Sequence, residues 1–108
     1  MKIVGFKVVV CCLLVAPVVL FAQTSFSDGA LAANPIFRQN CAKCHGKTAE
    51  GRRFGGPSLV SSKVTDTSAD DLRSIISNGK HRMPKFEGKL TPEEIDTLVQ
   101  QIRMLSKK

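Results

Sequence analysis

The sequence predicts an all-α domain of three to four helices. Apolar residues recur three and four positions apart in the segments between turns, as they do on one face of a helix. No stretch of useful length alternates apolar with polar residues, and the sequence carries no internal repeat. The 108 residues suffice for one domain but not for two, which excludes a large α/β enzyme.

The first third of the chain has the features of a targeting segment. A short basic head precedes residues 8–22, a run of 15 uncharged residues. A helix that spans a bilayer needs about 20 apolar residues, so this run fits a secretory signal peptide better. We predict that residues 1–32 are a cleaved signal peptide and that residues 33–108 form the mature domain. Cleavage after Ala22 and retention as a membrane anchor remain open.

A domain as small as the predicted mature one usually needs a stabilising element besides its hydrophobic core, which can be a disulfide, a metal or a cofactor. Of the four cysteines, only Cys41 and Cys44 lie after the predicted cleavage site. A disulfide between them would close a loop too short to stabilise the fold appreciably. We therefore expect a metal or a cofactor to be the stabilising element.

The first helix of the mature domain is expected to begin at Asn34, a good N-cap, with Pro35 at the first helical position. Five glycines and prolines in residues 46–57 predict a loop after it. Helical spacing along the first helix relates Ile36, Phe37, Asn40, Cys41 and Cys44.

Two further helices have clear start signals. Ser68 and Asp71 form the pattern of a capping box, and Gly79 provides the stop. Thr91 and Glu94 form a second capping box at the start of the last helix. The expected apolar faces consist of Leu72, Ile75 and Ile76 in one helix and of Ile95, Leu98, Val99, Ile102 and Leu105 in the other.

The motif that points to a function is C-x-x-C-H at residues 41–45. This is the attachment signature of a covalent haem. Cys41, Cys44 and His45 are related by i, i+3 and i+4, which places all three on one face of a helix. The two thiols can add to the two vinyl groups of a haem, while the imidazole binds the iron. The sequence therefore predicts one covalently attached haem c, with His45 as an axial ligand.

The motif is compatible with two other kinds of site. A thioredoxin-like redox site also uses C-x-x-C, but it needs a βαβ context that this sequence does not show. A zinc site could combine Cys41, Cys44, His45 and His81. However, the adjacent Cys44 and His45 are awkward joint ligands of one tetrahedral ion, and no second ligand pair exists.

The second axial ligand is expected in the segment between the last two helices. Met83 offers a soft thioether there, and the following proline stiffens the loop. The loop is polar and basic, which is a poor place for a methionine that only fills the core. His81 is the rival ligand, and a surface residue otherwise. Met83 is preferred because ligation by methionine and histidine suits an electron carrier.

With these motifs the chain resembles the small monohaem class I cytochromes c. It is most similar to the soluble carriers that can replace plastocyanin in algae and cyanobacteria, and to their bacterial relatives. Three segments carry the resemblance, at residues 41–46, 55–59 and 78–86, and it extends over residues 34–105. It implies the small cytochrome c fold, with the helices wrapped around one haem.

The resemblance also implies roles for single residues. The carbonyl group of Pro57 would accept a hydrogen bond from His45, and so raise the basicity of that ligand. Phe37 would pack where the first and last helices cross. The last helix of the family offers tyrosine or tryptophan at this crossing, whereas this chain offers Gln101 and Ile102.

The predicted function is that of a periplasmic electron carrier and not of an enzyme. Both axial positions are filled, which leaves no open site for a small-molecule substrate. We expect a monomer, with the thylakoid lumen and a membrane-anchored form as alternative locations. A dedicated haem subunit of a dehydrogenase or oxidase, and a haem-based sensor, are alternative functions. The expected haem pocket consists of Phe54, Leu59, Val64, Leu72, Ile75, Ile76, Phe86, Leu90, Leu98 and Ile102.

The charge balance bears on the partners. The formal net charge is +7. Basic residues flank both ligand segments and could steer a redox protein with an acidic docking face, although a plain solvated basic face fits equally well. Nucleic-acid binding is not expected. Acidic residues are interspersed among the basic ones, and no aromatic residues alternate with the basic residues to stack on bases. These basic residues are Lys43, Lys47, Arg52, Arg53, Lys80, Arg82 and Lys85.

Overall fold

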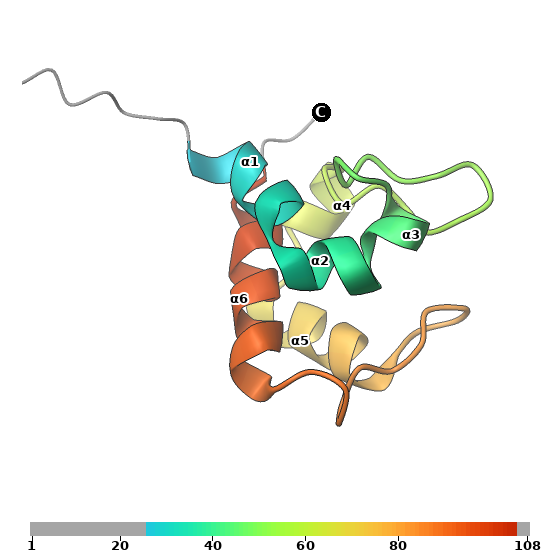
Figure 1. Ribbon diagram of the computed structural model, residues 1–108, viewed down its shortest axis with the longest axis vertical. Helices are drawn as coiled ribbons and strands as arrows, with labels where there is room; N and C mark the ends of the chain where they lie inside the picture. Colours follow the sequence, from blue (N-terminus) through green and yellow to red (C-terminus); the bar gives the residue numbers. More distant parts are fainter. Residues whose placement is uncertain (1–25, 106–108) are drawn as a thin grey trace, which may run out of the picture.

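The computed structural model describes residues 26–105 (Figure 1). Within them the chain is helical and contains no strand, so the all-α prediction is confirmed. None of these helices is long and apolar enough to cross a bilayer. The residues form α1 (Phe26–Ala33), α2 (Pro35–Asn40), α3 (Ala42–His45), α4 (Ser62–Thr65), α5 (Ala69–Asn78) and α6 (Pro92–Arg103).

The predicted count of three to four helices refers to residues 33–108, and the described part of that domain contains five, α2 to α6. Both α3 and α4 are four-residue turns, too short to show a periodic pattern in the sequence. The expected single first helix divides at Cys41, whose φ and ψ of −114° and −39° set it off from both neighbours. Even so, the Cys41 carbonyl accepts from the backbone N–H of His45 at 2.9 Å, so α3 continues almost directly from α2.

The helix caps follow the sequence signals closely. The side chain of Asn34 accepts from the backbone N–H of Ile36 at 2.8 Å. Thr91 and Glu94 form the complete reciprocal capping box. The box expected at residues 68–71 is only half formed: the Ser68 hydroxyl accepts from the Asp71 N–H, but the Asp71 carboxylate accepts from that hydroxyl instead of the Ser68 backbone. Aspartate is one methylene shorter than the glutamate that normally closes the box.

The core is built around α6, which contacts α1, α4 and α5. Leu98 and Val99 on α6 are each 1% exposed, and so is Phe37 on α2. Asn34, at the start of α2, donates from Nδ2 to Gln101 Oε1 on α6 at 2.8 Å. A polar bridge and the buried Ile102 therefore lie where related proteins were expected to offer a large aromatic side chain.

The predicted cleavage point after Ala32 falls inside α1. Leu31, one residue earlier, is completely buried in the core. The backbone N–H of Asn34 donates to the carbonyls of Ala30 and Leu31 at 3.1 Å, which ties α1 to the start of α2. Cleavage after Ala32 would remove this core side chain. Residues 8–22 lie outside the described residues.

Most of the expected pocket residues belong to the core or pack against it. Leu59, Leu72, Ile76, Phe86, Leu98 and Ile102 are buried, Val64 and Leu90 are partly buried against them, and Ile75 is half-buried.

Phe54 differs from the other expected pocket residues, because it lies outside the protein core and is 88% exposed. The backbone N–H of Gly56 donates to the Cys44 carbonyl at 2.8 Å, and this anchors a turn that carries Phe54 away from the core.

Candidate functional site

The C-x-x-C-H motif lies on α3 and on the residue just before it. Cys41 is half-buried, Cys44 is exposed, and both are free thiols. His45, the last residue of α3, is only 7% exposed. The one-turn helix thus presents two thiols and one imidazole within five consecutive residues.

The His45 ring is fixed by a single hydrogen bond. Its Nδ1 lies 2.8 Å from the carbonyl oxygen of Pro57. A carbonyl oxygen can only accept, so Nδ1 carries the proton and donates. In the neutral imidazole the lone pair then lies on Nε2. This is the tautomer and the orientation that a histidine needs as an axial ligand.

Two glycines allow the loop to close over this histidine. A Cβ on Gly56 would lie 2.7 Å from Cε1 and 2.8 Å from Nδ1 of His45. A Cβ on Gly55 would lie 2.5 Å from the Cys44 carbonyl oxygen. Only a residue without a side chain lets the backbone lie against the imidazole in this way. The Gly55-Gly56-Pro57 sequence alone indicated a loop, and the close approach could be found only in three dimensions.

Replacing Gly56 by alanine is expected to displace the imidazole. The new Cβ would overlap the ring, and such overpacking costs about 1–3 kcal/mol. We expect a lower free energy of unfolding in denaturant, together with a changed absorption spectrum of the haem protein. Gly29→Ala is the matched control, because a Cβ there meets nothing within 4 Å. Equal stability and identical spectra for the two variants would contradict the packing described.

Met83 lies on a tight turn held by backbone hydrogen bonds. Met83 N–H donates to the Lys80 carbonyl at 2.9 Å, and Lys80 N–H donates to the Met83 carbonyl at 3.2 Å. Gly79 permits this turn, since its φ is +76° and a Cβ would lie 2.5 Å from the Met83 carbonyl oxygen. Met83 is half-buried against the core, whereas His81 is exposed with a φ of +54°. In Figure 1, the turn and α3 both extend toward the right side of the molecule.

The environment of Cys41 differs from that of a redox-active C-x-x-C motif. Burial, and to a lesser extent the neighbouring Cys44, raises the pKa of the Cys41 thiol to about 11. Redox motifs of this spacing lower the thiol pKa, so that a thiolate can attack. Residues 26–105 also lack the strands of a βαβ unit. The thioredoxin-like interpretation therefore has no support here.

These groups fit a covalent haem. Two unpaired thiols stand three residues apart, and the imidazole beside them has its lone pair on Nε2. A thioether comes from a separate rigid turn. Such a set of donors defines the class of proteins that attach a haem through a C-x-x-C-H helix.

Comparison with known proteins identifies the family. A family model described as cytochrome C oxidase, cbb3-type, subunit III matches residues 29–102. A cytochrome c6 from Nostoc sp. is 36% identical over 87 residues, covering 67% of this chain and 71% of the relative. The solved cytochrome c6 of the diatom Phaeodactylum tricornutum has a TM-score of 0.55 at 26% identity, covering 70% of this chain and 91% of that one. The chain belongs to this family of c-type cytochromes.

A further relative is part of an oxidase. FixP, a subunit of the cbb3-type cytochrome c oxidase of Bradyrhizobium sp., is 33% identical over 79 residues. The match covers 70% of this chain but only 27% of FixP.

The predictions of a small class I c-type cytochrome and of the small cytochrome c fold are confirmed. Proteins of this family carry one covalently bound haem c, and the protein is an electron carrier with redox proteins as partners. The axial ligand roles of His45 and Met83 stay predictions.

Proposed function

We propose that the protein is an exported, diffusible electron carrier whose haem iron is ligated by His45 and Met83. The observation that carries this proposal is the hydrogen bond from His45 Nδ1 to the Pro57 carbonyl, at 2.8 Å. It leaves Nε2 as the donor atom and fixes the plane of the ring. The Met83 turn supports the second ligand, because methionine opposite histidine is the pair typical of electron-transferring haem.

Each part of the chain has a separate task in this function. Cys41 and Cys44 would hold the haem as thioethers, and His45 and Met83 would ligate its iron. The haem supplies reversible one-electron chemistry between Fe(III) and Fe(II). The apolar core around the pocket excludes water and disfavours the extra charge of the ferric form, while the thioether favours Fe(II). Both effects raise the reduction potential. If both residues ligate the iron, they would leave no position on it for a substrate, as expected for an electron carrier.

Location and partners follow from the sequence and the surface. The basic head and the uncharged run at residues 8–22 support export to the periplasm, with the thylakoid lumen as the alternative. All seven basic residues that flank the ligand segments are exposed, from Lys43 on α3 to Lys85 after the Met83 turn. These basic residues support the steering of a partner with an acidic docking face. The positive net charge also favours a monomer, because two copies of the protein repel each other.

A second candidate is a dedicated subunit of an oxidase. It is favoured by the match to the cbb3-type family model and to FixP, although this chain corresponds to about a quarter of FixP. The two functions differ in one measurable property. A dedicated subunit co-purifies with its complex at any dilution, whereas a carrier dissociates.

The test is an optically monitored redox titration of the matured protein. A potential well above zero, with the charge-transfer band of methionine bound to ferric iron, is the expected result. A potential well below zero without that band would exclude Met83 as a ligand. His81 or an open axial position would then be the better model, and a haem-based sensor would become the better function.

A further inference from the structure

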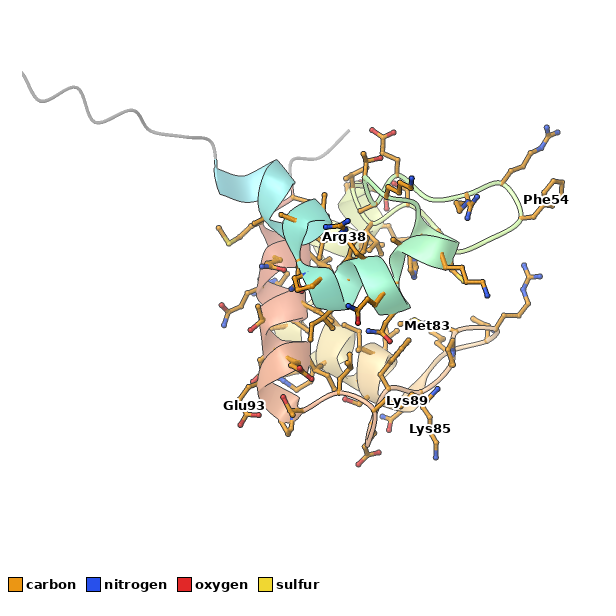
Figure 2. All side chains as sticks on the ribbon, in the orientation of Figure 1. Arg38, Phe54, Met83, Lys85, Lys89 and Glu93 are labelled. Atoms are coloured by element: carbon orange, nitrogen blue, oxygen red, sulfur yellow. The ribbon has the colours of Figure 1, made fainter. Side chains whose placement is uncertain are left out.

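Phe54 is the most exposed large hydrophobic residue of the described chain, at 88%, compared with 54% for Met104. Figure 2 shows its side chain at the outer tip of the loop after α3, pointing away from the protein. Scattered exposed apolar residues are ordinary on protein surfaces. Phe54 differs because the backbone beneath it is closely organised.

The tip is a hydrogen-bonded turn. Gly55 N–H donates to the Arg52 carbonyl at 3.0 Å, which closes a β-turn with Phe54 at its third position. Arg52 N–H donates to the Gly56 carbonyl at 3.2 Å, which pins the two ends of the turn together. The hydrogen-bonded turn fixes the backbone that carries the phenyl ring, so a partner that binds the ring pays less conformational entropy for ordering the loop.

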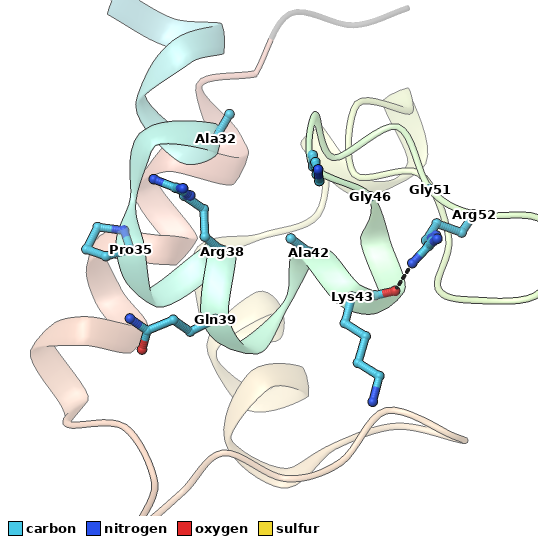
Figure 3. Close-up of a pocket in the computed structure, with 10 residues that line it drawn as sticks. Ala32, Pro35, Arg38, Gln39, Ala42, Lys43, Gly46, Gly51 and Arg52 are labelled. Atoms are coloured by element: carbon cyan, nitrogen blue, oxygen red, sulfur yellow. Dashed lines mark hydrogen bonds between the residues drawn. The ribbon is translucent and has the colours of Figure 1, made fainter.

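The turn is also fixed to the haem-attachment helix. Arg52 donates from Nη1 to the Lys43 carbonyl at 2.7 Å (Figure 3). Gly56 donates to the Cys44 carbonyl at 2.8 Å, and a Cβ on Gly55 would collide with that same oxygen at 2.5 Å. The aromatic tip is therefore held at a set position next to Cys44, where the haem is attached.

A hollow of about 490 Å³ lies between the tip and α3. Its lining contains three cationic side chains and no carboxylate, and the Arg53 guanidinium lies 5.7 Å from the centre of the Phe54 ring. Aromatic residues and arginine are the side chains enriched at protein interfaces, whereas lysine belongs to the polar rim. The residues that line the hollow are Lys43, Cys44, Arg52, Arg53, Phe54 and Gly55.

We propose that Phe54, with Arg53 and Lys43 beside it, forms the docking surface for a redox protein that presents an apolar depression rimmed by carboxylates. This inference rests on the proposed electron-carrier function and adds the residue that selects the partner. Phe54 would enter the depression and bury its ring, while the cations pair with the carboxylate rim. Charge complementarity favours an acidic protein here, because the lining of the hollow contains three cationic side chains and no carboxylate.

Reduced flavodoxin is a suitable probe, because it is an acidic redox protein with an exposed apolar flavin edge. One electron leaves the reduced flavin and is taken up by the ferric haem iron of the carrier, so the flavin is oxidised by one electron and the iron becomes Fe(II). Stopped-flow mixing at low ionic strength gives the second-order rate constant for this step. The variants are Phe54→Ala and the conservative Phe54→Leu, with Met104→Ala as the matched removal of an exposed apolar side chain elsewhere.

Phe54→Ala is expected to lower the rate constant about tenfold, Phe54→Leu less, and Met104→Ala not at all. Arg53→Gln is expected to lower it and to weaken its dependence on salt. Reduction of Phe54→Ala by dithionite, which needs no docking surface, and its reduction potential should equal those of the wild type.

Three results would overturn the proposal. Equal rate constants for Phe54→Ala and the wild type would show that the tip takes no part in docking. A shifted potential in Phe54→Ala would show that the ring lies on the haem and not on a partner. A wild-type protein that dithionite cannot reduce reversibly would refute the carrier function itself, and with it any docking surface for electron transfer.

Discussion

Replacing Met83 by alanine is expected to change the haem site more than any other single substitution outside the C-x-x-C-H motif. Without the thioether the iron loses one axial ligand and the stabilisation of its reduced form. Axial ligands span about 0.8 V in potential, so the fall should be on the order of 0.1 V or more. The charge-transfer band of the oxidised protein should disappear, and the reduced protein should bind carbon monoxide. Redox titration and difference spectra with carbon monoxide measure both effects.

His81→Ala is the control, because His81 is the rival ligand on the same turn. It should leave the potential and the spectrum unchanged, since the His81 side chain is exposed while Met83 packs against the core. If His81→Ala abolishes the band or permits carbon monoxide to bind, and Met83→Ala does not, the assignment of the second ligand must be reversed.

Loss of the Leu31 side chain is expected to be the largest single effect on stability among the α1 residues whose burial is described. Leu31 is completely buried against the core, and α1 contacts α6 directly. Truncation of a buried leucine to alanine costs about 2–5 kcal/mol, as lost transfer free energy and as a cavity. A chain that starts at Ala33 should lose at least as much. We therefore expect the exported protein to retain α1, as cleavage after Ala22 would ensure.

Two measurements test this expectation. The intact mass of the exported protein, corrected for one haem, gives its first residue. Denaturant unfolding then compares Leu31→Ala with Met104→Ala, which removes a similar apolar side chain that is 54% exposed. An exported protein that starts at Ala33, and is as stable as one that starts at Gln23, would refute the role assigned to α1.

The sequence by itself determined the fold class and the principal chemistry. Signals that act between neighbouring residues carry this information: the C-x-x-C-H spacing, the caps at Asn34 and Thr91, and the stop at Gly79. Each of them involves residues within one or two helical turns, so a linear pattern is sufficient. The cofactor follows in the same way, because its attachment motif spans only five residues.

Only the tertiary structure decided the features that depend on contacts between distant segments. Leu31 belongs to the core because α1 packs on α6, and no local pattern distinguishes it from the end of a targeting segment. Phe54 is apolar, so the sequence predicts that it is buried. The loop that is hydrogen-bonded to the Cys44 carbonyl nevertheless leaves it exposed to solvent. The need for Gly56 appears only when its backbone meets the His45 ring. The burial of a side chain and the close approach of two segments depend on which distant parts of the chain pack together. The spacing of motif residues and the helix caps depend only on residues that are neighbours in the sequence.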